Sequence, residues 1–254
     1  MSNIISCRTG VFGDIGEAFQ RFARAGVRFA ETPPAPEGDY AGMAAKARAA
    51  GVAIATISTQ LNVGTDEQAA ALEPVIDGAA SIGVAKIFIS IKPGEDTPPA
   101  DSYARMRRIS EYAAARGVSL CMETHPPFGT NGDVARQTIE AVNHPAFRYN
   151  FDTANIYYYN EGTDSVTELK KAAPYVGSVH LKDTDGGYHS GYFPELGQGV
   201  VDFPEVFRIL GAQGFLGPYT MELEGNCLGP LAPEERQAFL ERCVAYLRSI
   251  GAMD

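Results

Sequence analysis

The chain has 254 residues, of which 45% are hydrophobic and 20% charged, and its formal net charge is −10 at pH 7. This is the composition of a globular protein long enough for one large domain, and the acidic balance argues against a broad basic surface for nucleic acid. No run approaches the roughly 18 apolar residues of a membrane helix, and the first residues lack the pattern of a signal peptide. The four cysteines, Cys7, Cys121, Cys227 and Cys243, form no CxxC pair. We therefore expect a cytoplasmic protein with reduced thiols and with neither a nucleic acid nor a membrane as partner.

Short β-type runs alternate with helical patterns along the whole chain. The predicted strands are residues 4–7, 27–30, 53–57, 86–91, 119–122, 147–151, 177–180 and 219–223. The predicted helices are residues 16–25, 40–50, 67–82, 102–116, 133–142, 165–173, 203–213 and 233–250. Several helices end at a glycine followed by valine, which predicts a left-handed C-cap at Gly26, Gly51, Gly83 and Gly117.

Eight strand–helix units predict an α/β fold, a (β/α)8 TIM barrel that forms one domain over residues 1–254. The alternative is an open doubly wound sheet, but no GxGxxG follows the first strand and no Walker-type loop is present. The longest irregular segment, residues 183–201, is rich in glycine and aromatic residues. We expect it to cover the barrel mouth and to offer Tyr192, Phe193 or His189 to a substrate. An ordered structural loop, or an arm that docks on a second subunit, would have the same composition.

Four residues of metal-ligand type each end a predicted strand: Glu123, Asp152, His180 and Glu222. Because the carboxyl ends of barrel strands meet at one mouth, these side chains could hold one cation. Three carboxylates and one imidazole suit Mn, Mg or Co, and are tolerable for Zn. The alternative is that each residue caps its own strand or the following helix.

The segments around these residues resemble those of the xylose isomerase-like TIM barrel superfamily, which includes the sugar phosphate isomerases and epimerases. The segments are Met122-Glu123-Thr124-His125, Asn150-Phe151-Asp152-Thr153-Ala154-Asn155, Val179-His180-Leu181-Lys182-Asp183 and Met221-Glu222-Leu223-Glu224-Gly225. The resemblance implies that Glu123, Asp152, His180 and Glu222 bind one divalent metal ion. It also implies that Glu123 and Glu222 are catalytic: one removes the proton α to a carbonyl and the other returns it, through a metal-stabilised enediolate.

The chain departs from the pattern of the ketose epimerases at two positions. Many of them carry a histidine three residues after the aspartate of strand six, where this chain has Asn155. Many also carry an arginine in the loop after strand seven, where this chain offers His189, Ser190 and Tyr192. Both departures count against a standard ketose 3-epimerase. The superfamily that the chain resembles also includes abasic-site endonucleases, which hold three zinc ions with several extra histidines. This chain has only four histidines, none of them in predicted strands two to four, so a three-zinc site is not expected.

Further polar residues at or just beyond the strand ends are candidates for substrate binding. They are His125, Asn155, Lys182, His189, Arg8, Lys92 and Glu31. Each has an alternative role. His125 could pack against the adjacent prolines, and the cationic side chains could form ion pairs with neighbouring carboxylates.

The sequence therefore predicts a divalent-metal-dependent isomerase or epimerase of a small sugar or keto-sugar. The alternative is a metal-dependent lyase or dehydratase that acts on a keto-inositol or a 3-keto-sugar, because both reactions begin with removal of the same α-proton. A sugar-binding protein without turnover is a third hypothesis, which two carboxylates poised as bases argue against. The expected partner is a small carbohydrate, and a homo-oligomer is compatible with the chain.

Overall fold

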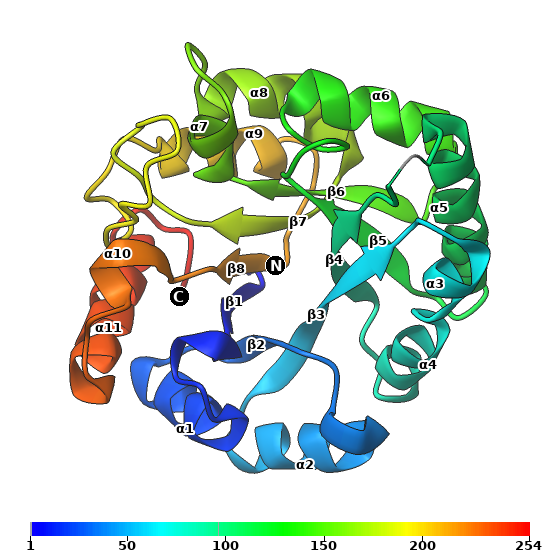
Figure 1. Ribbon diagram of the computed structural model, residues 1–254. Helices are drawn as coiled ribbons and strands as arrows, with labels where there is room; N and C mark the ends of the chain where they lie inside the picture. Colours follow the sequence, from blue (N-terminus) through cyan, green and yellow to red (C-terminus); the bar gives the residue numbers. More distant parts are fainter. Residues whose placement is uncertain (1, 96) are drawn as a thin grey trace.

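Eight parallel strands form a closed barrel in the computed structural model, which describes residues 2–95 and 97–254. The strands are β1 (Ile5–Arg8), β2 (Phe29–Thr32), β3 (Ala53–Asn62), β4 (Lys86–Lys92), β5 (Ser119–Glu123), β6 (Phe147–Asp152), β7 (Val176–Leu181) and β8 (Tyr219–Met221). They pair in sequence order, and β8 closes the barrel against β1. Figure 1 shows the helices as an outer ring around these strands. The predicted (β/α)8 barrel is thus confirmed.

Helices fill the connections between the strands. They are α1 (Ile15–Ala25), α2 (Tyr40–Ala49), α3 (Asp66–Ala70), α4 (Glu73–Ser81), α5 (Pro99–Ala114), α6 (Gly132–Val142), α7 (Asn155–Tyr159), α8 (Ser165–Ala172), α9 (Phe203–Gly211), α10 (Gly225–Leu228) and α11 (Pro233–Ser249). Three short 3-10 helices are also present, Thr9–Val11, Pro36–Gly38 and Ala173–Tyr175. The predicted C-cap glycines have positive φ, for example 82° at Gly26 and 72° at Gly117, values that L side chains rarely adopt.

The secondary structure differs from the prediction at several points: β2 begins two residues later than expected, and the short helices α7 and α10 were not expected. Two further differences concern longer elements. The single helix expected over residues 67–82 is wrong, because the chain breaks after α3 and starts again at α4, which has a proline in its first turn. Strand β3 continues to Asn62 instead of ending at Ile57, and it pairs with β4 as far as Lys92. The polar residues after Ile57 ended the sequence prediction, although a paired strand needs an apolar residue at only every second position. As a result β3 and β4 form a raised wall at one side of the mouth.

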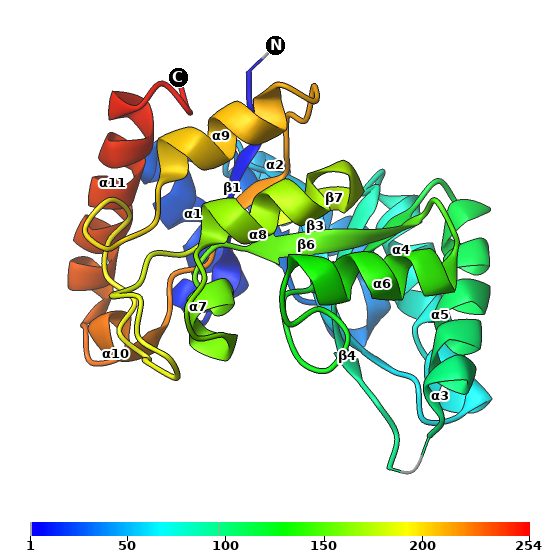
Figure 2. The ribbon, with the colours of Figure 1, turned by 90° about the horizontal axis from the view of Figure 1, so that it is seen from above.

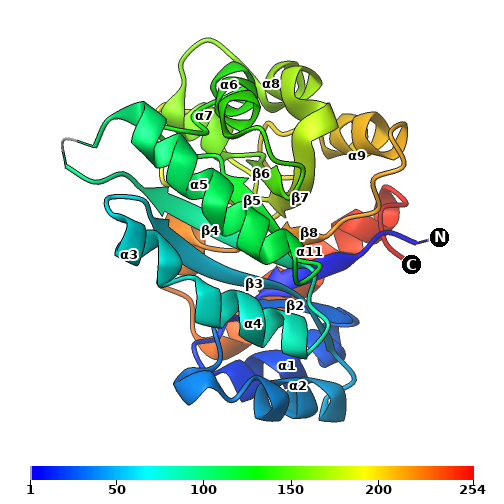
Figure 3. The ribbon, with the colours of Figure 1, turned by 90° about the vertical axis from the view of Figure 1, so that its right-hand side faces the viewer.

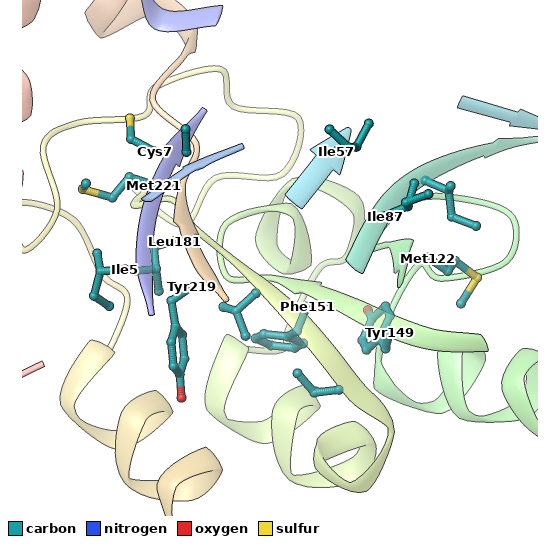
Figure 4. Packing of buried hydrophobic residues seen from close by; sticks show 14 of the residues in the cluster. Ile5, Cys7, Ile57, Ile87, Met122, Tyr149, Phe151, Leu181, Tyr219 and Met221 are labelled. Carbon is teal, nitrogen blue, oxygen red and sulfur yellow. The ribbon is translucent and has the colours of Figure 1, made fainter. Parts of the chain in front are cut away.

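Apolar and polar residues alternate along the barrel strands. Tyr149 and Phe151 belong to the buried apolar layer between the strands and the helices, part of which Figure 4 shows. Asn150, between them, accepts a hydrogen bond from Ser178 in β7 at 2.6 Å. Ser6 and Thr220 form a similar hydroxyl pair at 2.7 Å between β1 and β8. Polar pairs inside the barrel therefore lie beneath the residues that end the strands.

Figures 2 and 3 show that both termini lie at one end of the barrel, and Figure 2 places α7 and α10 toward the opposite end. That opposite end is the mouth formed by the carboxyl ends of the strands, where barrel enzymes place their active sites. Among the described residues, no helix is both long and apolar enough to cross a membrane. All four cysteines are free thiols.

Helix α1 packs on the barrel through buried apolar side chains, and this packing can be tested by its contribution to stability. Phe22 on α1 is fully buried, whereas Gln20 on the same helix is exposed. Phe22→Ala should lower the free energy of unfolding by about 3–5 kcal/mol, because it leaves a cavity in the layer between helix and barrel. Gln20→Ala, the matched control, should change it by no more than about 0.5 kcal/mol. Urea titrations that give the same stability for both variants would contradict this packing.

Candidate active site

Three of the predicted ligand residues converge at the mouth. Asp152 ends β6 and pairs in register with His180 on β7, while Glu222 directly follows β8. One potential ligand atom from each of the three lies within 4.8 Å of the others, and all three residues are buried. Neighbouring strand ends thus place two carboxylates and one imidazole around a common point.

Glu31, on β2, fixes the orientation of the His180 ring. Nε2 of His180 lies 3.2 Å from both carboxylate oxygens of Glu31, and both side chains are fully buried. Phe88 of β4 stacks on the ring with a centroid separation of 4.6 Å. Because the carboxylate can only accept, we assign the proton to Nε2. The lone pair of Nδ1 then points to Glu222 Oε2, at 3.3 Å, and to Asp152 Oδ2, at 3.9 Å.

The two oxygens of Asp152 have different surroundings. Oδ1 accepts hydrogen bonds from the backbone N–H groups of Ala154, at 2.9 Å, and Asn155, at 2.8 Å. Oδ2 is buried and lies 3.1 Å from Nζ of Lys182, whereas the buried Nδ1 of His180 has no hydrogen-bond partner. A buried ring nitrogen without a hydrogen bond is rare, and one that faces two carboxylate oxygens indicates a place for a cation.

Two basic side chains neutralise part of the acidic cluster. Arg8, at the end of β1, contacts Glu222 Oε1 through Nη1 and lies 3.2 Å from Glu31 Oε1 through Nε. Burial alone would raise the pKa of Glu31, but the nearby His180 imidazole and Arg8 guanidinium outweigh it and hold that pKa below its usual value.

Lys182 is the second basic side chain and lies deep in the cluster. Its Nζ is 2.7 Å from Glu222 Oε2, 3.1 Å from Asp152 Oδ2 and 2.8 Å from Glu224 Oε1. Burial alone would lower its pKa, but the carboxylates, chiefly Asp152 and Glu224, raise it above the usual value. Phe193 from the long loop covers the ammonium group at 5.0 Å from its ring centroid.

The charges of this cluster fit a divalent cation. Four carboxylates, those of Glu31, Asp152, Glu222 and Glu224, face only the two full positive charges of Arg8 and Lys182. Asp152, His180 and Glu222 are the residues that would hold the ion. Their mixed oxygen and nitrogen donors suit Mn, Mg, Co or Zn and do not select among them.

Glu123 lies at the same mouth but outside this group of three. It ends β5 and lines a cavity of about 310 Å³ together with Arg8, Phe88 and the β3–β4 wall residues Ser58, Thr59, Gln60 and Ser90. No ion pair of the Glu123 carboxylate is found among the residues that the structure describes. The structure thus brings Asp152, His180 and Glu222 together and leaves Glu123 outside this group, and the role of all four as metal ligands stays a prediction.

His125 and Asn155 both have partners within the protein. Nδ1 of His125 lies 2.6 Å from the carbonyl oxygen of Pro126, and its ring packs edge-on against Tyr159 at 5.0 Å. The Asn155 amide donates to the carbonyl of Thr124 at 3.2 Å, which ties the loop after β6 to the end of β5. For His125 these contacts correspond to the packing alternative, and a role of either residue in substrate binding stays a prediction.

His189 and Lys92 lie farther from the cluster. His189 is exposed on the long loop, at a positive φ of 53°, and packs edge-on against Tyr158 and Tyr188. Lys92 ends β4, two residues beyond the cavity-lining Ser90, at the top of the raised wall. Their roles in substrate binding stay predictions.

The loop of residues 183–201 is anchored at its base by Asp183. The buried Asp183 carboxylate accepts hydrogen bonds from the backbone N–H groups of Thr184, Gly197, Gly199 and Val201, at 2.8–3.2 Å. A Cβ at Gly199 would lie 2.2 Å from the carbonyl oxygen of Thr184, so only glycine fits there. Figures 1 and 2 show the loop, in yellow, beside α7 and α10. Both ends of the loop are thus fixed next to the mouth.

Sequence reasoning missed several residues of the site. Phe88 shares the barrel-facing side of β4 with Ser90, but an aromatic residue in an apolar strand carries no separate signal. Glu224 follows the strand end by two residues and carries no signal of its own in the sequence, yet it pairs with Lys182. The backbone contacts of Asp183 depend on how a distant part of the loop returns to it, which the sequence does not reveal.

Comparison with known proteins places this geometry in a family. A profile described as "Xylose isomerase-like TIM barrel" matches residues 19–243. The chain belongs to this family. Its family membership, expected from the four strand-end segments, is therefore confirmed.

Curated members of the family that resemble the chain are sugar-acting enzymes. An inosose dehydratase of Yersinia enterocolitica serotype O:8 is 30% identical over 135 residues, which cover 46% of the chain and 44% of the relative. An L-ribulose 3-epimerase of Methylomonas sp. (strain DH-1) is 32% identical over 128 residues, covering 48% and 41%. The match thus spans less than half the length of each of these relatives.

Solved structures with the same fold cover nearly the whole chain. A xylose isomerase domain protein from Planctomyces limnophilus has a TM-score of 0.79 at 22% identity and covers 98% of both chains. The D-psicose 3-epimerase of Clostridium cellulolyticum H10 has a TM-score of 0.79 at 14% identity, covering 97% of this chain and 98% of its own. At these identities the likeness establishes the fold.

The geometry of the cluster predicts that a divalent cation stabilises the protein. Mn²⁺ at 100 times its dissociation constant should add about 2.7 kcal/mol, which raises Tm by roughly 5–10 °C for a chain of this size. Asp152→Asn should weaken Mn²⁺ affinity by about 10–100-fold or more, because it removes a ligand charge. Glu161→Gln, at an exposed acidic residue, is the matched control and should leave the rise in Tm unchanged. A thermal shift that is equal in the two variants would mean that the ion binds elsewhere.

Proposed function

We propose that this protein is a divalent-metal-dependent isomerase or epimerase of a small sugar or keto-sugar. The observation that carries the proposal is the placement of the Asp152–His180–Glu222 group beside a polar cavity that Glu123 also lines. The family relationship supports it, because curated relatives are sugar epimerases and dehydratases. When bound, the cation would polarise a substrate carbonyl and offset the negative charge that develops on it.

The cavity suits a small polyhydroxylated molecule. Its volume of about 310 Å³ lies near the lower end of the range of small-molecule pockets, about 300–1,000 Å³. Hydroxyl and amide side chains of the β3–β4 wall, Ser58, Thr59, Gln60 and Ser90, supply hydrogen-bond donors and acceptors. These groups can orient a sugar by several hydrogen bonds without requiring it to carry a charge.

The two glutamates take different roles in this proposal. Glu123 is free of charged partners among the described residues, and it faces the cavity, so it can accept the proton α to the carbonyl. Glu222 is held by Arg8, Lys182 and His180, and lies on the other side of the mouth. It would return the proton from the opposite face or to the neighbouring carbon.

A dehydratase that acts on a keto-inositol or a 3-keto-sugar is the second candidate. The observation that favours it is the similarity to inosose dehydratases, of which two are 29–30% identical over about half of this chain. Removal of the α-proton is common to both reactions, and the dehydratase then expels a hydroxyl group at the β-carbon. Asn155 stands where many ketose epimerases carry a histidine, which counts against a standard ketose 3-epimerase.

The test is to incubate the protein and Mn²⁺ with a panel of ketoses, 3-keto-sugars and inososes in D2O and to follow the products by NMR. An isomerase or epimerase should place deuterium on the α-carbon and yield an isomer. A dehydratase should yield a product that has lost water. Binding of a sugar without any exchange would refute both candidates.

Glutamine substitutions separate the proposed roles of the two glutamates. Glu123→Gln should lower turnover by about 100-fold or more and should weaken Mn²⁺ binding less than Glu222→Gln does, because Glu123 lies outside the group of three. Glu222→Gln should lower both turnover and Mn²⁺ affinity. The control is again Glu161→Gln. Near-normal turnover of Glu123→Gln with its metal content confirmed would show that Glu123 is not the base.

The long loop is proposed to cover the mouth during the reaction and to exclude water from the reacting carbons. Shortening the chain between Gly187 and Gly197 removes Phe193, which lies over the Lys182 ammonium. Turnover should fall by roughly tenfold or more, whereas folding and Mn²⁺ binding should remain, because Asp183 and the cluster stay in place. Tyr188→Ala, at the exposed tip, is the control. Retained turnover, or loss of an oligomer in light scattering as the main effect, would contradict the cover role.

A further inference from the structure

Lys182 pairs with the same two oxygen atoms that a metal ion would need. The oxygens nearest to the His180 Nδ1 lone pair are Glu222 Oε2, at 3.3 Å, and Asp152 Oδ2, at 3.9 Å. The Lys182 ammonium lies 2.7 Å from the first and 3.1 Å from the second. The Lys182 ammonium group is therefore a cation that already lies beside the two carboxylates of the group of three.

Lys182 has a third partner, Glu224, which does not belong to the group of three. Glu224 Oε1 accepts from Lys182 Nζ at 2.8 Å, and the side chain of Glu224 is 47% exposed, against 0% for Asp152 and 3% for Glu222. Glu224 follows Glu222 by two residues, just before α10, outside strand β8. It is thus a carboxylate at the edge of the cluster, open to solvent, that can keep Lys182 paired.

We propose that Lys182 is an exchangeable internal cation of this site, and that its contacts with Asp152 and Glu222 and the binding of a divalent ion exclude each other. Without the ion, the ammonium group holds the two carboxylates together. When the ion is bound, Asp152 and Glu222 would hold it in place of the ammonium group, and Lys182 would stay paired with Glu224. This inference rests on the metal site of the proposed function and concerns binding, not the reaction that follows.

Electrostatic repulsion explains why the Lys182 ammonium and a divalent ion would exclude each other at these carboxylates. Two cations that share an oxygen lie within about 4 Å of each other, and at that distance like charges repel strongly inside a protein. Leaving Asp152 and Glu222 without any cation would be costly too, since both are buried and carry the same charge. A lysine that can move on its flexible stem meets both conditions, because it neutralises the site when the ion is absent and leaves when the ion arrives.

Arg8 provides an internal comparison of equal charge. It contacts Glu222 through Oε1, not Oε2, and its other partner is Glu31. Neither contact uses an oxygen that faces His180 Nδ1. If Lys182 acts by its position, removal of Arg8 should have a different effect on metal affinity from removal of Lys182. If only net charge matters, the two should be equivalent.

The experiment measures Mn²⁺ binding by isothermal titration calorimetry, and Tm with and without Mn²⁺, for the wild-type protein, Lys182→Met and Arg8→Met. Lys182→Met should bind Mn²⁺ about tenfold tighter or more, because the ion no longer displaces a competing cation. Without Mn²⁺ its Tm should be lower than that of the wild type, and its rise in Tm on Mn²⁺ addition should be larger. Arg8→Met should tighten binding clearly less than Lys182→Met, because Arg8 contacts neither of the oxygens that face His180 Nδ1.

Glu224→Gln tests the release of Lys182 and does not depend on whether Lys182→Met folds. Removing this partner should weaken Mn²⁺ binding by about three- to tenfold, because the displaced ammonium has no carboxylate to keep it. In a Lys182→Met background the same substitution should have almost no effect, so the double variant should show strong coupling. A direct electrostatic effect of Glu224 on the ion would persist in both backgrounds.

Three results would overturn the proposal: Lys182→Met binds Mn²⁺ no tighter than the wild type, Arg8→Met tightens binding as much as Lys182→Met, or Glu224→Gln acts equally in both backgrounds. Failure of both the wild type and Lys182→Met to bind Mn²⁺ would overturn it together with the metal site. Tight binding with the expected coupling, but no turnover of any sugar, would support the role of Lys182 and refute only the proposed reaction.

Discussion

Four carboxylates converge at the carboxyl end of this barrel, and their mutual repulsion is the constraint on which the site depends. Glu31, Asp152 and Glu222 are buried, so water cannot screen them, and folding is favourable only if positive groups lie among them. Arg8 and Lys182 meet most of this need, and the imidazole of His180 spans the distance between Glu31 on one side and Asp152 and Glu222 on the other. Arg8 and Lys182 neutralise only part of the negative charge of the four carboxylates. The remaining negative charge favours the binding of a cation.

This repulsion explains why the residues that support the proposed ligands are held in positions as fixed as those of the ligands. Glu31 sets which nitrogen of His180 carries the proton, and backbone N–H groups after β6 occupy one oxygen of Asp152 while the other faces the group. Partners of this kind hold a ligand ready for a metal, and a lone substitution of one ligand would leave the others in place. The barrel supplies the frame, since adjacent strands in register bring Asp152 and His180 side by side.

The sequence predicted the barrel and three members of the site because both depend on local patterns. Strand ends can be read from apolar runs that stop at a polar residue, and the topology of a closed parallel barrel then brings those ends together. The boundary of β3 could not be read in this way, because its last residues are polar and are ordered by pairing with β4. The contacts of Glu224, Phe193 and Asp183 depend on how loops return to the mouth, which no local pattern encodes.

The anchoring of the loop by Asp183 also bears on how such a protein could change over time. One carboxylate gathers backbone N–H groups from the start and the end of the loop, so the two ends are fixed without the help of the tip. Residues 185–192, where Tyr188 and Tyr192 are exposed, can then vary in length and side chain while the cluster below remains intact. A barrel with this arrangement can acquire a new ligand preference by substitutions in one surface segment, with little loss of stability and no rearrangement of the groups at the strand ends.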